Sequence, residues 1–114
     1  MANTFKLVTK AGVTSSDVIY TPDSVTTVVL GLILGNTTTS QVTATVSLAS
    51  TTSARAGDNN EANQTVELIT DAPIPAGSSL ELLAGNKVVM ENNDALSVSA
   101  TGSTDVALSI MEIS

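Results

Sequence analysis

The stretch that decides the fold runs from residue 71 to residue 100 and reads DAPIPAGSSLELLAGNKVVMENNDALSVSA. Turn-forming residues interrupt its short apolar runs at Pro75-Ala76-Gly77, Gly85-Asn86 and Asn92-Asn93-Asp94. A proline that leads to a glycine suits a tight turn, and Gly-Asn between two apolar runs indicates a two-residue hairpin. We therefore predict a hairpin in which Leu80 to Leu82 form one strand and Val88 to Met90 form its return strand. Pro73 and Pro75 lack a backbone donor, so we expect their segment on a sheet edge or entering a strand.

Side chains alternate with a period of two residues on both sides of this stretch. No segment shows the i, i+3, i+4, i+7 spacing of an amphipathic helix. Further strands are predicted at Thr4 to Lys10, Val18 to Thr21, Val25 to Asn36, Val42 to Leu48, Thr65 to Thr70, Leu96 to Ala100 and Asp105 to Ile113. About eight or nine short strands, with turns about every eight to twelve residues, predict an all-β fold. We expect an antiparallel, jelly-roll-like β-sandwich that forms a single domain, residues 1–114.

The longest predicted strand, Val25 to Asn36, is apolar on both faces. One face carries Val28, Leu30, Leu32 and Leu34, and the other carries Val29, Gly31, Ile33 and Gly35. Such a run predicts a central strand that is covered on both sides. Its glycines indicate either the close approach of another backbone or a β-bulge. In the first predicted strand, Phe5 and Leu7 share one face, and Lys6 and Lys10 share the other.

The composition limits the core and excludes several classes of partner. The chain has one Phe, one Tyr, no Trp and no Cys. Its core must therefore be aliphatic, and a thin core of this kind makes association between subunits a plausible further source of stability. A net charge of −7 disfavours nucleic acids and anionic membrane surfaces. Frequent Thr and Ser residues lead us to expect strands that face water without large apolar patches.

The sequence predicts no secretory signal and no transmembrane segment. The first ten residues, MANTFKLVTK, lack the apolar core of a signal peptide. The longest apolar run, Val28 to Leu34, is far shorter than the ~20 residues that span a bilayer. We therefore expect a soluble protein that is made in the cytoplasm.

The search for catalytic residues finds no usable set. The chain has no histidine, so the commonest general base and the commonest metal ligand are both missing. A nucleophilic Ser or Thr needs an activating partner, and the only amine candidates are Lys6, Lys10 and Lys87. Glu81 and Glu91 lie on adjacent strands of the predicted hairpin, but solvent-exposed positions explain this carboxylate pair better than glycoside hydrolysis does. We predict that the chain is not an enzyme and has no catalytic residue.

Two segments carry oxygen donors that suit calcium, GDNNEAN at 57–63 and Asn92-Asn93-Asp94. The first segment lies in the long polar break from Ser50 to Asn63, which we interpret as an exposed loop. The second is a turn, where Asn and Asp are common without any ion. Polar loops therefore explain both segments better than metal sites do, and we predict no bound metal and no cofactor.

Four segments carry a resemblance to a known class of proteins. They are TFKLVTKAGV at 4–13, TTVVLGLILGNTT at 26–38, APIPAGSSLELLAGNKVVMENNDALSV at 72–98 and VALSIMEIS at 106–114. Through them the chain resembles small structural proteins of tailed bacteriophages, especially those of marine and cyanobacterial phages. The resemblance includes no ligand-binding motif, so it assigns a role to no individual residue.

The resemblance implies a virion protein, most often a capsid decoration or cement protein that binds the major capsid protein and stabilises the shell. It also implies a homo-oligomer, with a trimer favoured. Contacts with other copies and with the capsid are expected at Met1 to Lys10 and at Ser50 to Asn63. A neck, tail or fibre-attachment component of the virion is the first alternative. A carbohydrate- or receptor-binding module that uses Tyr20 is the second.

Overall fold

The computed structural model describes residues 3–50, 64–83 and 87–114, and these residues form two antiparallel β-sheets. Their strands are β1 (Asn3–Val13), β2 (Ser16–Tyr20), β3 (Thr26–Asn36), β4 (Val42–Ser50), β5 (Gln64–Ile74), β6 (Ser79–Leu82), β7 (Val88–Met90), β8 (Ala95–Ala100) and β9 (Thr104–Ile113). None of the described residues is helical, so that part of the chain contains no helix able to cross a membrane. The predicted all-β class is confirmed.

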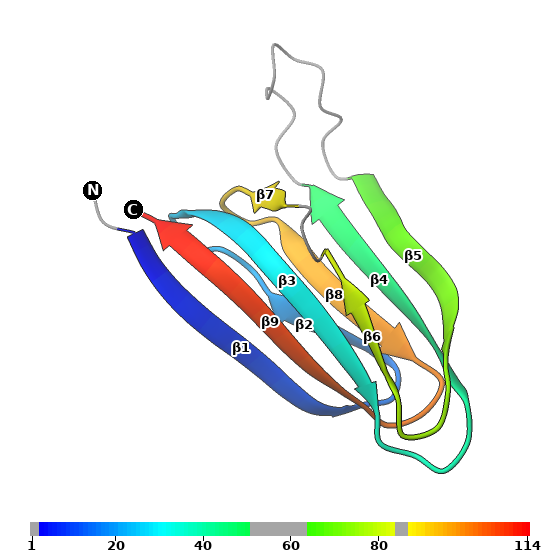
Figure 1. Ribbon diagram of the computed structural model, residues 1–114. Coiled ribbons are helices and arrows are strands. Elements are labelled where there is room, and N and C mark those ends of the chain that lie inside the picture. Colours follow the sequence, from blue (N-terminus) through cyan, green and yellow to red (C-terminus); the bar gives the residue numbers. More distant parts are fainter. Residues whose placement is uncertain (1–2, 51–63, 84–86) are drawn as a thin grey trace.

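The two sheets form a sandwich with jelly-roll topology (Figure 1). Sheet A has the order β1-β9-β3-β6, with β7 also paired to β3, and sheet B has the order β2-β8-β4-β5. Pairing therefore joins the first strand to the last, the second to the eighth, and β4 to β5. This is the order of one long antiparallel hairpin rolled into two layers, which is how a jelly roll is built.

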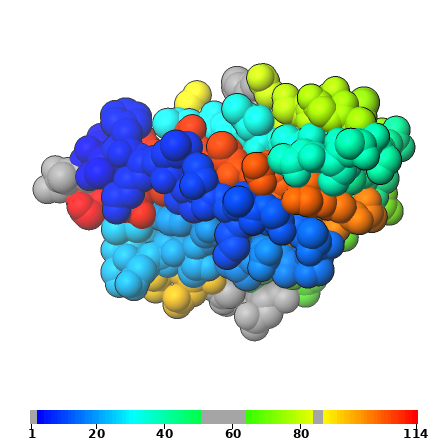
Figure 2. Space-filling model, turned by 90° about the horizontal axis from the view of Figure 1, so that it is seen from below, coloured from blue at the N-terminus to red at the C-terminus, as the bar shows by residue number. Residues whose placement is uncertain are grey.

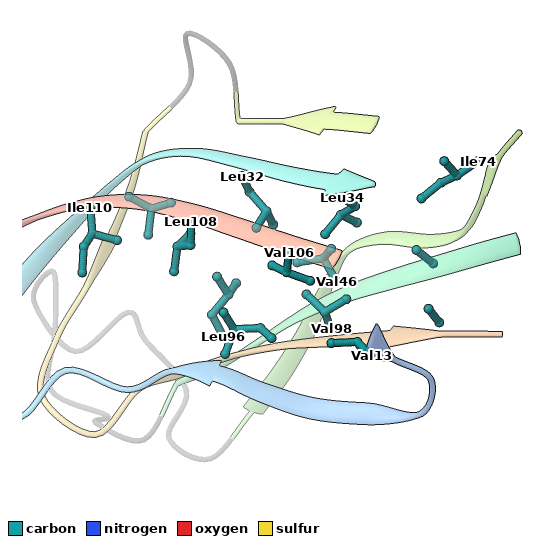
Figure 3. Close-up of a cluster of buried hydrophobic side chains, with 14 of the residues drawn as sticks. Val13, Leu32, Leu34, Val46, Ile74, Leu96, Val98, Val106, Leu108 and Ile110 are labelled. Atoms are coloured by element: carbon teal, nitrogen blue, oxygen red, sulfur yellow. The ribbon is translucent and has the colours of Figure 1, made fainter. Parts of the chain in front are cut away.

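An aliphatic core fills the space between the sheets (Figure 3). Side chains from β3 and β9, such as Leu32 and Leu108, point toward Leu96 and Val98 of β8. The core is ring-free: its buried hydrophobic members are Val13, Ile19, Val29, Leu32, Leu34, Val42, Ala44, Val46, Ile74, Met90, Leu96, Val98, Ala100, Val106, Leu108 and Ile110. Each large member contributes about 1.5–3 kcal/mol on burial, so the alternation of apolar residues in β4, β8 and β9 specifies which face turns inward.

Strand β3 is central in sheet A, as predicted, but only its inner face is covered within the chain. The register with β9 shifts between Val29 and Gly31, so Leu30 forms a β-bulge. The bulge places Val29, Leu32 and Leu34 together on the buried face, which strict alternation did not predict. On the outer face Ile33 is 45% exposed, so the expectation of cover on both sides is wrong for the described chain.

The predicted hairpin between β6 and β7 is also wrong. Both strands pair antiparallel with β3 and so run in the same direction, β6 beside Leu32 to Gly35 and β7 beside Thr27 to Val29. They form one edge strand of sheet A that is interrupted between Leu82 and Val88. The Gly85-Asn86 turn lies outside the described residues. Because β6 and β7 do not face each other, Glu81 and Glu91 are not cross-strand neighbours.

The predicted turn at Pro75-Ala76-Gly77 is confirmed. The backbone N–H of Ser78 donates to the Pro75 carbonyl at 3.1 Å, and Gly77 has a φ of 68°. That dihedral lies in the region where a side chain would be strained, which explains the glycine. Pro73 lies in β5, the edge strand of sheet B, where its missing donor is tolerated as predicted.

Asn36 fixes the same end of the sandwich from inside. Its side chain is 4% exposed, and its Nδ2 donates to the carbonyls of Ser40 at 2.8 Å and Ile74 at 2.9 Å. Its Oδ1 accepts from the Thr38 backbone N–H at 2.9 Å. One buried amide therefore joins the turn after β3 to the end of β5, and its hydrogen bonds offset the cost of burying it.

Candidate docking face

The outer faces of the two sheets differ in chemistry. The outward rows of sheet B pair hydroxyl with hydroxyl, because Thr45 lies opposite Ser99 and Ser47 lies opposite Ser97. The expectation of strands that face water without large apolar patches therefore fits the centre of sheet B, whereas Val18 and Val66 are 55% and 53% exposed on its two edge strands. On sheet A it is wrong, because the outward positions carry large apolar side chains.

Four of these apolar residues lie in one row across sheet A. Phe5 of β1 is opposite Met111 of β9, Met111 is opposite Val28 of β3, and Val28 is opposite Val89 of β7. The two ends of the row are the most open, with Phe5 72% and Val89 57% exposed. Leu7, 65% exposed, follows Phe5 on the same face of β1. We call the outward side of sheet A the apolar face; its members are Phe5, Leu7, Thr9, Val28, Gly31, Ile33, Gly35, Glu81, Val89, Asp105, Ala107, Ser109 and Met111.

The apolar face is raised at one end of the strands and hollowed at the other. Next to the row of Phe5 and Met111, the register brings Leu7, Ser109 and Gly31 together. Beyond them lies a shallow, open depression of about 350 Å³, lined by Thr9, Ala11, Ile33, Gly35, Asp105 and Ala107 among others. Small residues at Ala11, Gly35 and Ala107 line the depression. Beside it, a Cβ added to Gly31 would meet nothing within 4 Å.

The four sheet edges are protected against pairing with another strand. Edge strand β1 carries Lys6 and Lys10, and lysines on an edge oppose strand addition. Edge strand β2 is only five residues long. Edge strand β5 has two register shifts against β4 and contains Pro73. The opposite edge of sheet A is interrupted between β6 and β7. Any protein contact is therefore expected through a face and not through strand addition.

Figure 2 shows the side of the molecule where β1 and β2, in dark and lighter blue, bring the edges of both sheets together. A polar network closes the sandwich there. The Tyr20 hydroxyl donates to Glu112 Oε2 at 2.5 Å and lies 2.8 Å from the hydroxyl of Thr27, which is fully buried. Lys6 Nζ lies 2.7 Å from Glu112 Oε1. The network therefore joins β2 of sheet B to β1, β3 and β9 of sheet A.

The network changes the acidity of two of its members. Burial, followed by the hydrogen bond to Glu112, raises the pKa of Tyr20 from 10.0 to about 12. Hydrogen bonds from Lys6 and then Tyr20 lower the pKa of Glu112 below its ordinary value of 4.5. At neutral pH the phenol is therefore neutral and the carboxylate charged, which keeps the hydrogen bond and the ion pair of the network in place.

The residues considered for chemistry are dispersed. Lys6 is committed to Glu112, and Lys10 lines the depression together with Asp105. Lys87 immediately precedes β7, on the far side of sheet A from β1. Glu81 lies on the apolar face, opposite Ile33, and Glu91 accepts a hydrogen bond from the Thr26 hydroxyl at 3.2 Å. The candidate lysines and the candidate glutamates are therefore not brought together at a common serine or threonine.

The Asn92-Asn93-Asp94 turn uses its oxygens within the chain. Asn92 Oδ1 accepts from the backbone N–H of Ser24 at 2.7 Å, and Asp94 Oδ2 accepts from that of Glu91 at 3.0 Å. Asn93 has a φ of 71°, a turn conformation that Asn tolerates. Across residues 3–50, 64–83 and 87–114, no three acidic side chains are grouped as metal ligands would be. The GDNNEAN segment lies outside the described residues.

The two segments expected to contact other proteins have different outcomes. From residue 3 onward, Met1 to Lys10 belongs to strand β1 and is not a free arm, yet it supplies Phe5 and Leu7 to the apolar face. Ser50 ends β4, and residues 51–63 lie outside the described part of the chain.

No protein-family model and no curated protein matches the chain. Among solved structures, the chain is similar to a protein of Bacillus endospore appendages, a family of disulfide-linked pili, with 13% identity and a TM-score of 0.43 over 96% of this chain and 85% of that one. It is similar to a chain of infectious bursal disease virus, Gx strain, with 11% identity and a TM-score of 0.38 over 98% of this chain and 37% of the viral one. It is also similar to a chain of the cyanophage Pam1 capsid, with 13% identity and a TM-score of 0.34 over 96% and 84%. All three similarities are distant.

Proposed function

We propose that this chain is a non-catalytic structural protein of a bacteriophage virion. Within that class we propose a capsid decoration or cement protein that binds the major capsid protein and stabilises the shell. The observation that carries the structural role is the contrast between the apolar face of sheet A and the hydroxyl-bearing face of sheet B. Contiguous exposed apolar surface of this kind marks a contact with another macromolecule. The virion assignment is supported by the resemblance of the four sequence segments.

The shape of the fold suits this role. A sandwich with an aliphatic core and protected edges is stiff and does not polymerise by uncontrolled strand addition. A net charge of −7 keeps free subunits soluble before assembly. We propose that the protein functions as a homo-oligomer in the virion. The trimer is implied by the resemblance alone, whereas the geometry of the apolar face favours a different unit, argued below.

Quantitative mass spectrometry of purified particles, from a phage that encodes the chain, tests the proposal. A decoration protein is expected on the order of hundreds of copies per particle, because it repeats with the shell lattice. About six or twelve copies would instead indicate the neck or tail, where rings of low symmetry are found. Absence from washed particles would contradict the virion assignment altogether.

Carbohydrate binding is the competing function, and glycan-array binding tests it. A sugar platform needs an accessible ring, and the Tyr20 hydroxyl is already bound to Glu112 and Thr27. Phe5 is the more open ring. Specific glycan binding that disappears in Phe5→Ala but survives in Leu7→Ala would replace the structural proposal with this one.

A further inference from the structure

We propose that two copies of this chain pack their apolar faces against each other about a two-fold axis. The axis lies between the two sheets, perpendicular to their strands and above Ser109 and Gly31. This inference deepens the homo-oligomer part of the proposed function and does not depend on the virion assignment.

The protected edges restrict how two copies can meet. Lys6 and Lys10 on β1, the shortness of β2, the bulges of β5 and the break between β6 and β7 all oppose a continuous sheet through two copies. Packing of one sheet on another remains open, because it uses outward side chains and no backbone hydrogen bonds. Such packing would remove little apolar surface from water on the hydroxyl-bearing face of sheet B. On the apolar face of sheet A it would bury exposed apolar side chains, which is favourable.

The apolar face is complementary to itself when one copy is turned by half a rotation. In β9, Met111 and Ala107 lie two residues on either side of Ser109. Rotation about an axis above Ser109 therefore places the raised row of Phe5, Met111, Val28 and Val89 over the row of Thr9, Ala107, Ile33 and Glu81 of the other copy. Glu81 then lies at the rim of the interface, on the edge strand β6. Each copy then fills the hollow of its partner, as an isologous interface requires.

Small residues at the axis allow the two sheets to approach closely. Gly31 and Ser109 lie opposite each other in the register, and an added Cβ on Gly31 would meet nothing in its own chain within 4 Å. A two-fold axis parallel to the strands would instead stack raised row on raised row. It would also leave the carboxylates of Glu81 and Asp105 of both copies at the same end of the interface. The perpendicular axis moves these charges to opposite ends of the interface.

The available area is sufficient for a stable dimer. Strand β9 has ten residues, and sheet A is three strands wide along β9 and four strands wide where β6 or β7 pairs with β3. At about 3.3 Å per residue and about 4.8 Å between strands, the face covers roughly 600 Å². Two copies would bury roughly 1,200 Å² in total, above the ~1,000 Å² that a specific interface needs. When the same face of each copy is buried in the contact, no such face is left for a third copy. The geometry therefore predicts a dimer and not the trimer that the resemblance implies.

Sedimentation equilibrium of the purified full chain tests the proposal. The unaltered chain is expected to dimerise. Leu7→Glu is expected to be monomeric at the same concentrations, because it introduces two carboxylates beside the axis of a desolvated interface. The matched control is Val18→Glu, since Val18 is an apolar side chain 55% exposed on edge strand β2 of sheet B. This control is expected to remain a dimer. A monomeric or trimeric unaltered chain overturns the proposal, as does a dimer that only Val18→Glu disrupts.

Cross-linking gives a second readout that does not depend on how Leu7→Glu folds. The chain has no native cysteine, so Ser109→Cys and Ser97→Cys each carry a single thiol, on opposite outer faces. A bis-maleimide that spans about 10 Å, the separation of packed sheets, is expected to join two Ser109→Cys chains efficiently and to leave Ser97→Cys chains single. Equal cross-linking of both variants, or preferential cross-linking of Ser97→Cys, overturns the two-fold arrangement. A dimer in solution combined with absence from phage particles would reject only the virion assignment.

Discussion

Tyr20 joins the two sheets through a single oxygen atom. The residue belongs to β2 of sheet B, whereas Thr27 and Glu112, which contact its hydroxyl, belong to β3 and β9 of sheet A. Because the Tyr20 proton is donated to Glu112, the Thr27 hydroxyl is left to donate to the Tyr20 oxygen. The Thr27 side chain is fully buried and has no access to water in the folded chain. A hydrogen bond lost at this position therefore leaves a buried polar group without a partner.

We expect Tyr20→Phe to lower the free energy of unfolding by about 1–3 kcal/mol, the usual cost of a buried hydroxyl that loses its partner. Urea unfolding followed by far-ultraviolet circular dichroism measures the change. Ser97→Ala is the matched control, because it removes a hydroxyl from the outer face of sheet B without opening the network. A Tyr20→Phe variant as stable as the unaltered chain would show that the network contributes nothing to the fold.

The pKa shifts predict losses of stability at both extremes of pH. The pKa of Glu112 is lowered on folding, so its contribution is present above pH 4.5 and is lost as the pH falls through the folded-state pKa. The pKa of Tyr20 is raised to about 12, so its contribution is complete below pH 10 and is lost as the pH rises toward 12. Between these two ranges the network is expected to be insensitive to pH.

Glu112→Gln tests the acid side of this prediction. The variant has no carboxylate to protonate at this site, so its stability is expected to fall less steeply below pH 4.5 than that of the unaltered chain. Unfolding by urea at several acid pH values measures the difference. Glu67→Gln is the control for removal of one negative charge, because Glu67 is exposed on edge strand β5 of sheet B, away from the network. Parallel acid profiles for the unaltered chain and Glu112→Gln would contradict the assignment.

Two glycines differ in how much room their surroundings leave for a side chain. A Cβ added to Gly102, between β8 and β9, would lie 2.6 Å from Val42 Cγ1 at the start of β4. A Cβ added to Gly31 in β3 meets nothing within 4 Å. We expect Gly102→Ala to destabilise the chain by about 1–3 kcal/mol through overpacking, and Gly31→Ala to change the stability of the monomer by less than about 0.5 kcal/mol. Thermal unfolding of both variants at low protein concentration measures the contrast, and similar melting temperatures would refute it.

The sequence predicted the positions of the strands better than it predicted which strands pair with each other. Alternation in β4, β8 and β9 identified the inward face correctly, because burial of every second side chain acts on each strand separately. Gly85-Asn86 predicted a hairpin between β6 and β7, yet both strands pair with β3. A turn signal in the local sequence carries no information about pairing with a strand that is distant in the chain. The bulge at Leu30 was suggested by the neighbouring glycine, but its effect on the facing of Leu32 was not predicted.

The candidate face was only partly predictable for the same reason. Phe5 and Leu7 were placed on one face of their strand, and the doubly apolar pattern of β3 indicated cover on both sides. Nothing local indicated that Met111 and Val28 would line up between Phe5 and Val89, because this row is created by pairing between distant strands. The contact between Tyr20 and Glu112 spans 92 residues and has no signal in either segment.

For the whole molecule, the rolled topology predicts slow folding. The first strand pairs with the last, so Asn3 must meet Ile113 before sheet A is complete. Contacts between residues so distant in sequence carry a large loop-closure cost, and all-β proteins of this kind fold in about milliseconds to seconds. Stopped-flow circular dichroism after dilution from urea measures the rate. Complete refolding within microseconds would contradict the strand order of both sheets.

The position of Tyr20 gives the chain a natural optical reporter. The sequence contains one tyrosine and no tryptophan, so its near-ultraviolet absorption comes almost entirely from this one phenol. That ring lies where β2 meets three strands of sheet A, and the absorption band of a tyrosine shifts when its hydroxyl ionises. A spectrophotometric titration of the unmodified protein measures the pKa of Tyr20. A fall in that pKa from about 12 toward 10.0 would report that the two sheets have separated around the ring, with no dye and no engineered probe.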